Sequence, residues 1–167
     1  MKNVATRVPD PDEENARAGM IAPNPVLLEE GSYIYRFASH TANFGYHASP
    51  WWILQKDFEA IAERADRAGL ALGRKARWDL SVLPKWGSKM NVAVEARVAD
   101  RIWAWTGLAK PQQEQAPNGK IIRMFGNRDI KQLYLCGLVD RFGMLTPRGR
   151  HSLAVTGAKL IPSSSIF

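Results

Sequence analysis

The chain has 167 residues, a mass of 18.7 kDa and a formal charge of +7. This length suits one domain and excludes a large multidomain assembly. Hydrophobic residues make up 46% and charged residues 23%, as in chains that bury their own core. The single cysteine, Cys136, and three scattered histidines lack the spacing of a metal site, so we expect no metal. We find no long apolar run and no signal-peptide centre, and we therefore expect a cytoplasmic protein without a membrane segment.

The charge is unevenly distributed along the chain. Residues 1–30 contain three basic and six acidic residues, a net charge of −3, so residues 31–167 carry +10. Residues 1–24 lack apolar periodicity and predict a flexible acidic lead-in, followed by a single α+β domain over residues 25–167. The basic body favours an anionic partner such as a cofactor or a nucleic acid, and the alternative is a solvated basic surface without a partner.

The first predicted elements are two strands and a helix. Alternation over residues 32–37 predicts a strand with Arg36 on the face opposite Tyr35, and we expect a shorter extended segment over residues 44–48. Ser49-Pro50 is typical of a helix start, and an apolar face repeats from residue 54 to residue 72. The helix should end at Gly69 or Gly73, with a second short helix from Gly73 to residue 82.

The second half of the sequence is rich in predicted strands. We expect strands over residues 92–98, 101–105, 120–125 and 131–136, a polar loop over 111–119, and one more strand or turn at 148–155. Strands follow the helix without a regular βαβ alternation. This order favours an α+β domain over a doubly wound parallel sheet.

Three short segments resemble a known superfamily. They are Tyr35-Arg36-Phe37, the stretch 45–50 (GYHASP) with Ser49, and Gln132-Leu133-Tyr134. Their order resembles the ADP-ribosyltransferase superfamily, most nearly the bacterial NAD glycohydrolase toxins of the tuberculosis necrotizing toxin type. Residues 105–112 also look like the passage that precedes the late strand of these toxins. The resemblance spans residues 32–138 piecewise, through short and degenerate motifs.

The resemblance implies a fold, an activity and partners. The fold would be two small, packed, mostly antiparallel sheets with one main amphipathic helix after the second strand. The activity would be cleavage of the nicotinamide–ribose bond of NAD, by a glycohydrolase or a mono-ADP-ribosyltransferase acting as a toxin or effector. Partners would be NAD and either a protein target or a neutralising immunity protein. Such a toxin is delivered into another cell without a classical signal peptide.

The resemblance also implies roles for individual residues. Arg36 would grip the diphosphate, because its planar fork binds phosphate oxygens in pairs. Gln132 would orient ribose hydroxyls or a water, and together with Arg36 it forms the catalytic pair. Ser49 would hydrogen-bond the ribose or the nicotinamide amide. Aromatic side chains would form the remaining NAD contacts, with a stacking wall for the pyridinium ring: Tyr46, Trp51, Trp52 and Tyr134.

Each assignment has a structural alternative. Arg36 could pair with an acid across the sheet, Ser49 could only cap a helix, Gln132 could only satisfy a loop, and the aromatic residues could be core. The family's late-strand glutamate is replaced by Tyr134 or Gln132, and Glu114 is the nearest upstream carboxylate. Two other functions therefore stay open: a basic nucleic-acid-binding module, and a catalytically inactive fold that binds and inhibits a protein partner.

Overall fold

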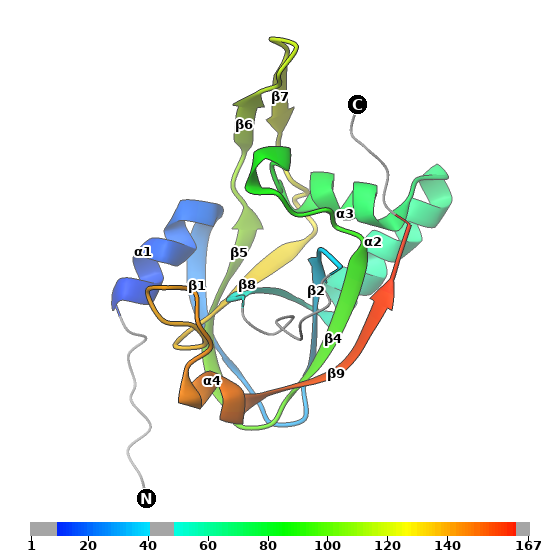
Figure 1. Ribbon diagram of the computed structural model, residues 1–167. Helices are drawn as coiled ribbons and strands as arrows, with labels where there is room; N and C mark the ends of the chain where they lie inside the picture. The colour runs from blue at the N-terminus through cyan, green and yellow to red at the C-terminus, as the bar shows by residue number, and fades with distance from the viewer. Residues whose placement is uncertain (1–9, 41–48, 163–167) are drawn as a thin grey trace, which may run out of the picture.

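The computed structural model describes residues 10–40 and 49–162, which form nine strands, four α-helices and one short 3-10 helix. Figure 1 shows their arrangement. In chain order the elements are α1 (Asp10–Gly19), β1 (Met20–Leu28), β2 (Tyr33–Ala38), β3 (Trp51–Leu54), α2 (Gln55–Ala68), α3 (Leu72–Asp79), η1 (Pro84–Trp86), β4 (Val92–Val98), β5 (Ile102–Ala109), β6 (Gln112–Gln115), β7 (Ile121–Met124), β8 (Lys131–Leu135), α4 (Pro147–Ser152) and β9 (Leu153–Leu160).

Seven of the strands form one antiparallel sheet in the order β1-β5-β8-β3-β2-β4-β9, and β6 and β7 form a separate hairpin. The α+β prediction is confirmed. The resemblance predicts two small packed sheets, whereas the structure has one seven-stranded sheet and a hairpin. The four-residue strand β3 pairs with β2 on one edge and with β8 on the other, and so joins the two groups of strands into one sheet. The main helix α2 follows β3, the third strand, since β1 adds a strand before the predicted ones.

The main core lies inside the curled sheet. Apolar residues of β1, β5 and β8 meet those of β2 and β4, as Figure 1 shows for the strands themselves. The outer faces are covered by helices, because each half of the sheet leaves a second apolar face. Helix α1 packs on β5 and β8, whereas α2 and α3 pack on β2 and β3. On α2, Phe58 stacks on Tyr35 with ring centroids 4.5 Å apart.

The prediction of a flexible lead-in over residues 1–24 is wrong for residues 10–24, and residues 1–9 lie outside the described part of the chain. Residues 10–19 form α1, and β1 pairs with β5 from Met20 to Leu28. The apolar content is low, but Ala16 and Met20 are buried against the sheet. Pro23 and Pro25 are tolerated because β1 is an edge strand with a register shift between Ile21 and Asn24.

The predicted helix start at Ser49-Pro50 is also wrong. Trp51 and Trp52 pair with β8, and the helix begins at Gln55 with no side-chain cap on its first turn. Large aromatic residues favour a pleated, half-buried surface, and here that preference overrides the capping signal. Ser49 Oγ instead accepts a hydrogen bond from Trp51 N at 3.3 Å, as in a serine turn.

The remaining expectations are mostly confirmed. Strands occupy the predicted regions of the second half, α2 ends at Gly69 in the left-handed conformation, and a short helix follows it. Two segments differ: residues 112–115 of the expected polar loop form β6, and the expected strand or turn at residues 148–155 is α4 followed by the long strand β9. No helix in the described ranges is long and apolar enough to span a bilayer.

Candidate functional site

A cavity of about 570 Å³ lies where β2, β3 and β8 meet the end of α1 and the loops that follow α3 and β5. This volume is within the range of small-molecule and cofactor sites. Its wall contains Arg36, Ser49 and Gln132, which the sequence nominated, together with Trp51 and Trp52. The other described residues that line it are Ala18, Gly19, Phe37, Ile53, Leu80, Ser81, Val82, Trp86, Ser88, Met90, Lys110 and Gln112.

The two nominated catalytic residues flank β3 at two gaps in the sheet. The ladder between β2 and β3 ends at Tyr35 and Ile53, so Arg36 is the next residue along β2. The ladder between β8 and β3 ends at Leu133 and Trp52, so Gln132 is the next residue along β8. Both keep partners on their other edges, in β4 and β5. Arg36 and Gln132 thus lie on opposite sides of the short central strand β3, each one residue beyond the end of a ladder.

Arg36 is the inner cation of the cavity. Its Cζ lies 5.8 Å from the centroid of the Trp52 ring, which places the guanidinium over an aromatic face. Burial lowers the pKa of Arg36 to about 10, so the side chain still carries a full charge at neutral pH. The cavity has a second cation in Lys110, and none of its described lining residues is a carboxylate. An anionic group is therefore the complementary ligand.

Gln132 is held from its amide end. Its Nε2 donates a hydrogen bond of 2.8 Å to the carbonyl oxygen of Leu80, in the turn after α3. The alternative that Gln132 only satisfies a loop thus accounts for the amide nitrogen but not for the amide oxygen. This hydrogen bond fixes the direction of the side chain. The amide oxygen takes no part in it and can still accept a hydrogen bond.

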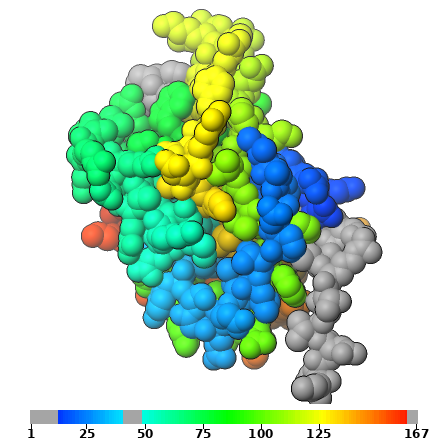
Figure 2. Space-filling view, turned by 180° about the vertical axis from the view of Figure 1, so that it is seen from behind, coloured from blue at the N-terminus to red at the C-terminus, as the bar shows by residue number. Residues whose placement is uncertain are grey.

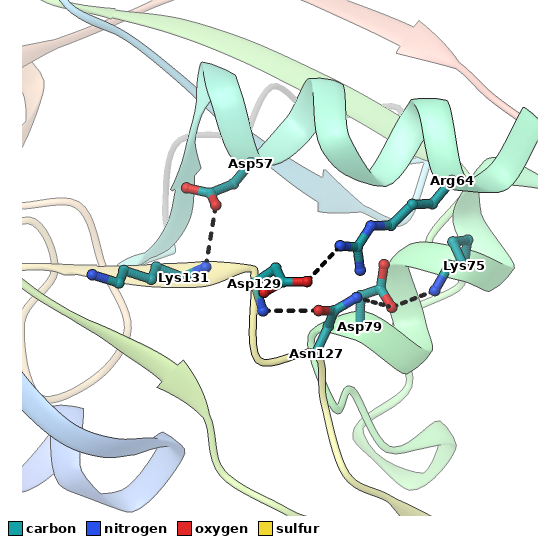
Figure 3. Close-up of polar contacts among 7 residues, drawn as sticks. All are labelled: Asp57, Arg64, Lys75, Asp79, Asn127, Asp129 and Lys131. Atoms are coloured by element: carbon teal, nitrogen blue, oxygen red, sulfur yellow. Dashed lines mark hydrogen bonds and ion pairs between the residues drawn. The ribbon is translucent and has the colours of Figure 1, made fainter.

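A polar network fixes the segment that leads into β8 and Gln132, as Figure 3 shows. Asp129 pairs with Arg64 of α2 at 2.7 Å, and Asn127 Nδ2 donates to Asp79 of α3 at 3.3 Å. Asp57 accepts a hydrogen bond from Lys131 N at 3.3 Å, and burial raises the pKa of Asp57. Seen from behind, this segment, coloured yellow, crosses the surface between the two helices on one side and the blue α1–β1 segment on the other (Figure 2).

The aromatic residues divide between wall and core. Trp52 is 1% exposed and belongs to both the main core and the cavity wall. Trp51 lines the cavity and meets Tyr134 edge-on, with centroids 5.0 Å apart and an interplanar angle of 79°. Tyr134 itself packs in the cluster under α1 and is not among the lining residues. Its expected direct contact with NAD is therefore not supported by its position, and it acts as a backing for Trp51.

Ser49 reaches the cavity, whereas Tyr46 lies outside the described residues. The carbonyl oxygen of Ser49 accepts a hydrogen bond of 2.6 Å from Trp52 Nε1, so Ser49 fixes the indole as well as the turn. Glu114, considered as a substitute carboxylate, accepts hydrogen bonds from Lys85 N at 3.3 and 3.2 Å and is not a lining residue. It therefore supports the β6–β7 hairpin.

Several lining residues were not predicted. Ser81 and Met90 have positive φ angles of 52° and 50°, in a region that side chains other than glycine and asparagine rarely adopt. Ser81 is 2% exposed, and its buried hydroxyl has no hydrogen-bond partner among the described residues. Trp86 ends the three-residue helix η1 and Lys110 lies between β5 and β6, and such short segments carry little sequence pattern. The one available hint was the mixture of aromatic and basic residues at Lys85-Trp86.

Arg77 holds the wall that contains the strained residues. This buried side chain donates to the carbonyl oxygen of Val82 at 3.2 Å and also to that of Ser88, both of which belong to cavity-lining residues. Burial lowers the pKa of Arg77. Its two bonds tie together the two ends of residues 82–88, which include η1. The wall is thus fixed from behind without contact between Arg77 and the cavity.

Comparisons with known proteins give similarity of fold. No protein-family model matches the sequence, and no curated protein matches it. Among solved structures, a chain of "Rhs1-CT in complex with cognate immunity protein RhsI1" is similar with a TM-score of 0.52 and 18% identity, over 86% of this chain and 84% of that chain. A chain of "Structure of Tne2 in complex with Tni2" is similar with a TM-score of 0.43 and 12% identity, over 85% of this chain and 94% of that chain. The fold is therefore similar to that of a chain in the complex of Rhs1-CT with its cognate immunity protein.

Proposed function

We propose that the protein is an effector that cleaves the nicotinamide–ribose bond of NAD. One observation carries the proposal. Arg36, Ser49 and Gln132, which lie up to 96 positions apart in the sequence, line a single cavity together with Trp51, Trp52 and Trp86. The resemblance that nominated them did not depend on this arrangement, so their convergence supports it independently.

The cavity offers the groups that the reaction needs. Bond cleavage builds positive charge on the ribose and releases a flat aromatic amide, while the diphosphate must be held in place. Arg36 supplies a fixed positive fork for phosphate oxygens. Trp51 and Trp52 supply aromatic surface for the pyridinium ring, and a face of this kind stabilises a cation. Gln132, with its nitrogen committed to Leu80, presents an acceptor oxygen to a ribose hydroxyl or a water.

The acceptor of the ADP-ribosyl group is either water or a protein. The wall contains no carboxylate among its described residues, and a carboxylate is the group with which transferases of the resembled superfamily usually act. Water as acceptor requires no additional group on the protein. The proposal therefore places hydrolysis first, with ADP-ribose and nicotinamide as products.

The biological role proposed is that of a toxin delivered into another cell. A chain of similar fold belongs to a structure in which Rhs1-CT is bound to its cognate immunity protein. We propose by analogy that a neutralising protein partner exists for this chain. The basic body with its charge of +10 over residues 31–167 favours an acidic partner, because opposite charges accelerate association and raise specificity.

The direct test is nicotinamide release from NAD by the purified chain. Wild type should release nicotinamide, Arg36→Ala and Gln132→Ala should lose most of the activity, and Lys159→Ala should keep it. Lys159 is an exposed cation on β9 outside the cavity and controls for the loss of one charge. No nicotinamide release by wild type, or equal release by wild type and all variants, would refute the proposal. Labelled NAD with a protein extract separates hydrolysis from transfer, since only transfer labels protein.

Two other outcomes identify the alternatives. Binding of NAD without turnover would indicate an inactive fold that binds a partner. A gel shift with single-stranded or duplex nucleic acid at about 50 mM salt, lost at higher salt, would indicate a phosphate-backbone binder.

A further inference from the structure

Trp86 is an unusual component of the cavity wall. It is 54% exposed, yet it lines the same cavity as Trp52, which is 1% exposed. The exposure difference defines an inner end at Trp52 and Arg36 and an outer end at Trp86. Exposed tryptophan is a large apolar surface in water, and such surfaces often mark a binding site.

The neighbours of Trp86 fix where the indole lies. Trp86 ends η1, and the next residue, Gly87, turns the chain with a φ of 80°. Lys85 N donates to the carboxylate of Glu114 on β6, so η1 lies against the base of the β6–β7 hairpin (Figure 1). Side chains alternate along a strand, and Gln112 therefore shares the Glu114 face of β6. Gln112 lines the cavity with Trp86.

Lys110 adds a second positive charge to the wall of the cavity that Trp86 lines. Its backbone nitrogen donates to the carbonyl oxygen of Gly19 at 2.9 Å, which anchors the residue at the junction of α1 and β1. Its side chain is exposed, in contrast to the half-buried Arg36. The cavity thus has a half-buried cation over the buried Trp52 and an exposed cation in the wall that also contains the exposed Trp86.

We propose that Trp86, Lys110 and Gln112 form a subsite for a nucleoside 5′-monophosphate, the adenylate half of a dinucleotide. The base stacks on Trp86, the phosphate binds Lys110, and Gln112 hydrogen-bonds the base or the ribose with an amide that both donates and accepts. A dinucleotide has two flat rings and two phosphates, and the cavity presents two aromatic surfaces and two cations. The proposal rests on the proposed function for the identity of the whole substrate.

Binding of three probes tests the subsite without any turnover. Calorimetry with adenosine 5′-monophosphate, adenosine and ribose 5-phosphate measures the base and the phosphate separately. Trp86→Ala should weaken binding of the monophosphate about tenfold and leave ribose 5-phosphate nearly unchanged, while Trp86→Phe restores most of the loss. Lys110→Ala should weaken the monophosphate and ribose 5-phosphate, and leave adenosine nearly unchanged.

The controls match the variants in chemistry. Phe142→Ala removes an aromatic side chain that is 74% exposed and does not line the cavity, and Lys159→Ala removes an exposed cation elsewhere. Both should bind the monophosphate as wild type does. Melting temperatures within about 2 °C of wild type establish that each variant is folded. If Trp86→Ala binds the monophosphate as tightly as wild type, or if wild type does not bind it, the subsite is refuted.

The outcomes separate this proposal from the previous one. A chain that releases no nicotinamide but binds the monophosphate through Trp86 and Lys110 keeps the subsite and loses the NAD-cleaving activity. A chain that releases nicotinamide with the same kcat/KM in wild type, Trp86→Ala and Lys110→Ala keeps the activity and loses the subsite. A free nucleotide as the natural ligand would appear as tight monophosphate binding with no gain in affinity for NAD.

Discussion

Replacing Gly19 with alanine tests how the N-terminal helix positions the cavity wall. A Cβ at Gly19 would lie 2.5 Å from Cη2 of Trp51, against the 3.4 Å at which ordinary contact begins. The ring must therefore move by about 0.9 Å, the difference between these two distances. Tyr134 meets the ring edge-on on its core side, so we expect the displacement to be directed into the cavity.

The expected stability change has the opposite sign to the one predicted by helix propensity. Gly19 ends α1 without a positive φ, so alanine fits the backbone, and propensity alone predicts a gain of about 0.5–1 kcal/mol. Forcing extra volume into packed side chains costs about 1–3 kcal/mol. We expect a net loss of about 1–2 kcal/mol, or about 2–8 °C in melting temperature. A shift of this size in a catalytic wall can also reduce the rate of reaction about 100-fold.

Gly157→Ala is the matched control for this substitution. Gly157 lies in β9, and a Cβ there meets nothing within 4 Å. Urea denaturation and nicotinamide release are measured on both variants and on wild type. Equal stability and equal activity of Gly19→Ala and wild type would refute the inference that Trp51 rests against Gly19. If Gly157→Ala loses as much stability and activity as Gly19→Ala, the effect belongs to glycine replacement in general.

Three further changes have defined expectations. Gln132→Glu cannot donate to the Leu80 carbonyl, and we expect about tenfold slower nicotinamide release, with Gln132→Asn as the comparison that keeps an amide. Tyr35 donates to Glu95 at 2.7 Å, and burial, followed by this bond, raises the pKa of Tyr35 from 10.0 to about 12. The folded state thus favours the neutral phenol, and its contribution of about 1 kcal/mol is complete below pH 10 and lost as the pH rises through 12. The difference in melting temperature between wild type and Tyr35→Phe should shrink over that range, and a constant difference would contradict the assignment. Ser81→Gly should raise the free energy of unfolding by about 1 kcal/mol, because it relieves a positive φ and removes a buried hydroxyl that has no partner in the described part of the chain. A lower urea midpoint would contradict this.

The parts of the site that could be predicted from the sequence lie on regular elements. Alternation along β2 separates Arg36 from Tyr35 and Phe37. In the structure Tyr35 and Phe37 pack in the cluster under α2 and α3, whereas the Arg36 guanidinium lies over the Trp52 ring. Gln132 likewise occupies the strand that its neighbours predict. Period-2 patterns are local, so they determine which face a residue occupies without knowledge of partners.

The parts that could not be predicted depend on contacts between distant segments. Strand β3 has only four residues, and it exists because Trp51 and Trp52 pair with a strand 80 positions later in the chain. Strand β1 contains two prolines and little apolar periodicity, and it is held by pairing with β5. Neither pairing has a sequence signal within the segment itself, so local capping and composition arguments gave the wrong answer at both places.

Several features around the cavity reduce the stability of the fold, and together they favour a ligand site. Ser81 and Met90 adopt left-handed conformations, the buried Ser81 hydroxyl has no hydrogen-bond partner among the described residues, and burial lowers the pKa of the Arg36 guanidinium. Each of the two backbone conformations costs about 1–2 kcal/mol. These costs lie in the wall of the cavity, whereas Ala22, which also has a positive φ, lies in β1 outside it. The helices behind the wall are stabilised by ordinary packing and by the bonds of Arg77. Strain of this kind is retained where binding selects for it. An anionic ligand at Arg36 and Lys110 would supply the opposite charge that the described wall lacks, and we therefore expect it to stabilise the folded protein at this wall.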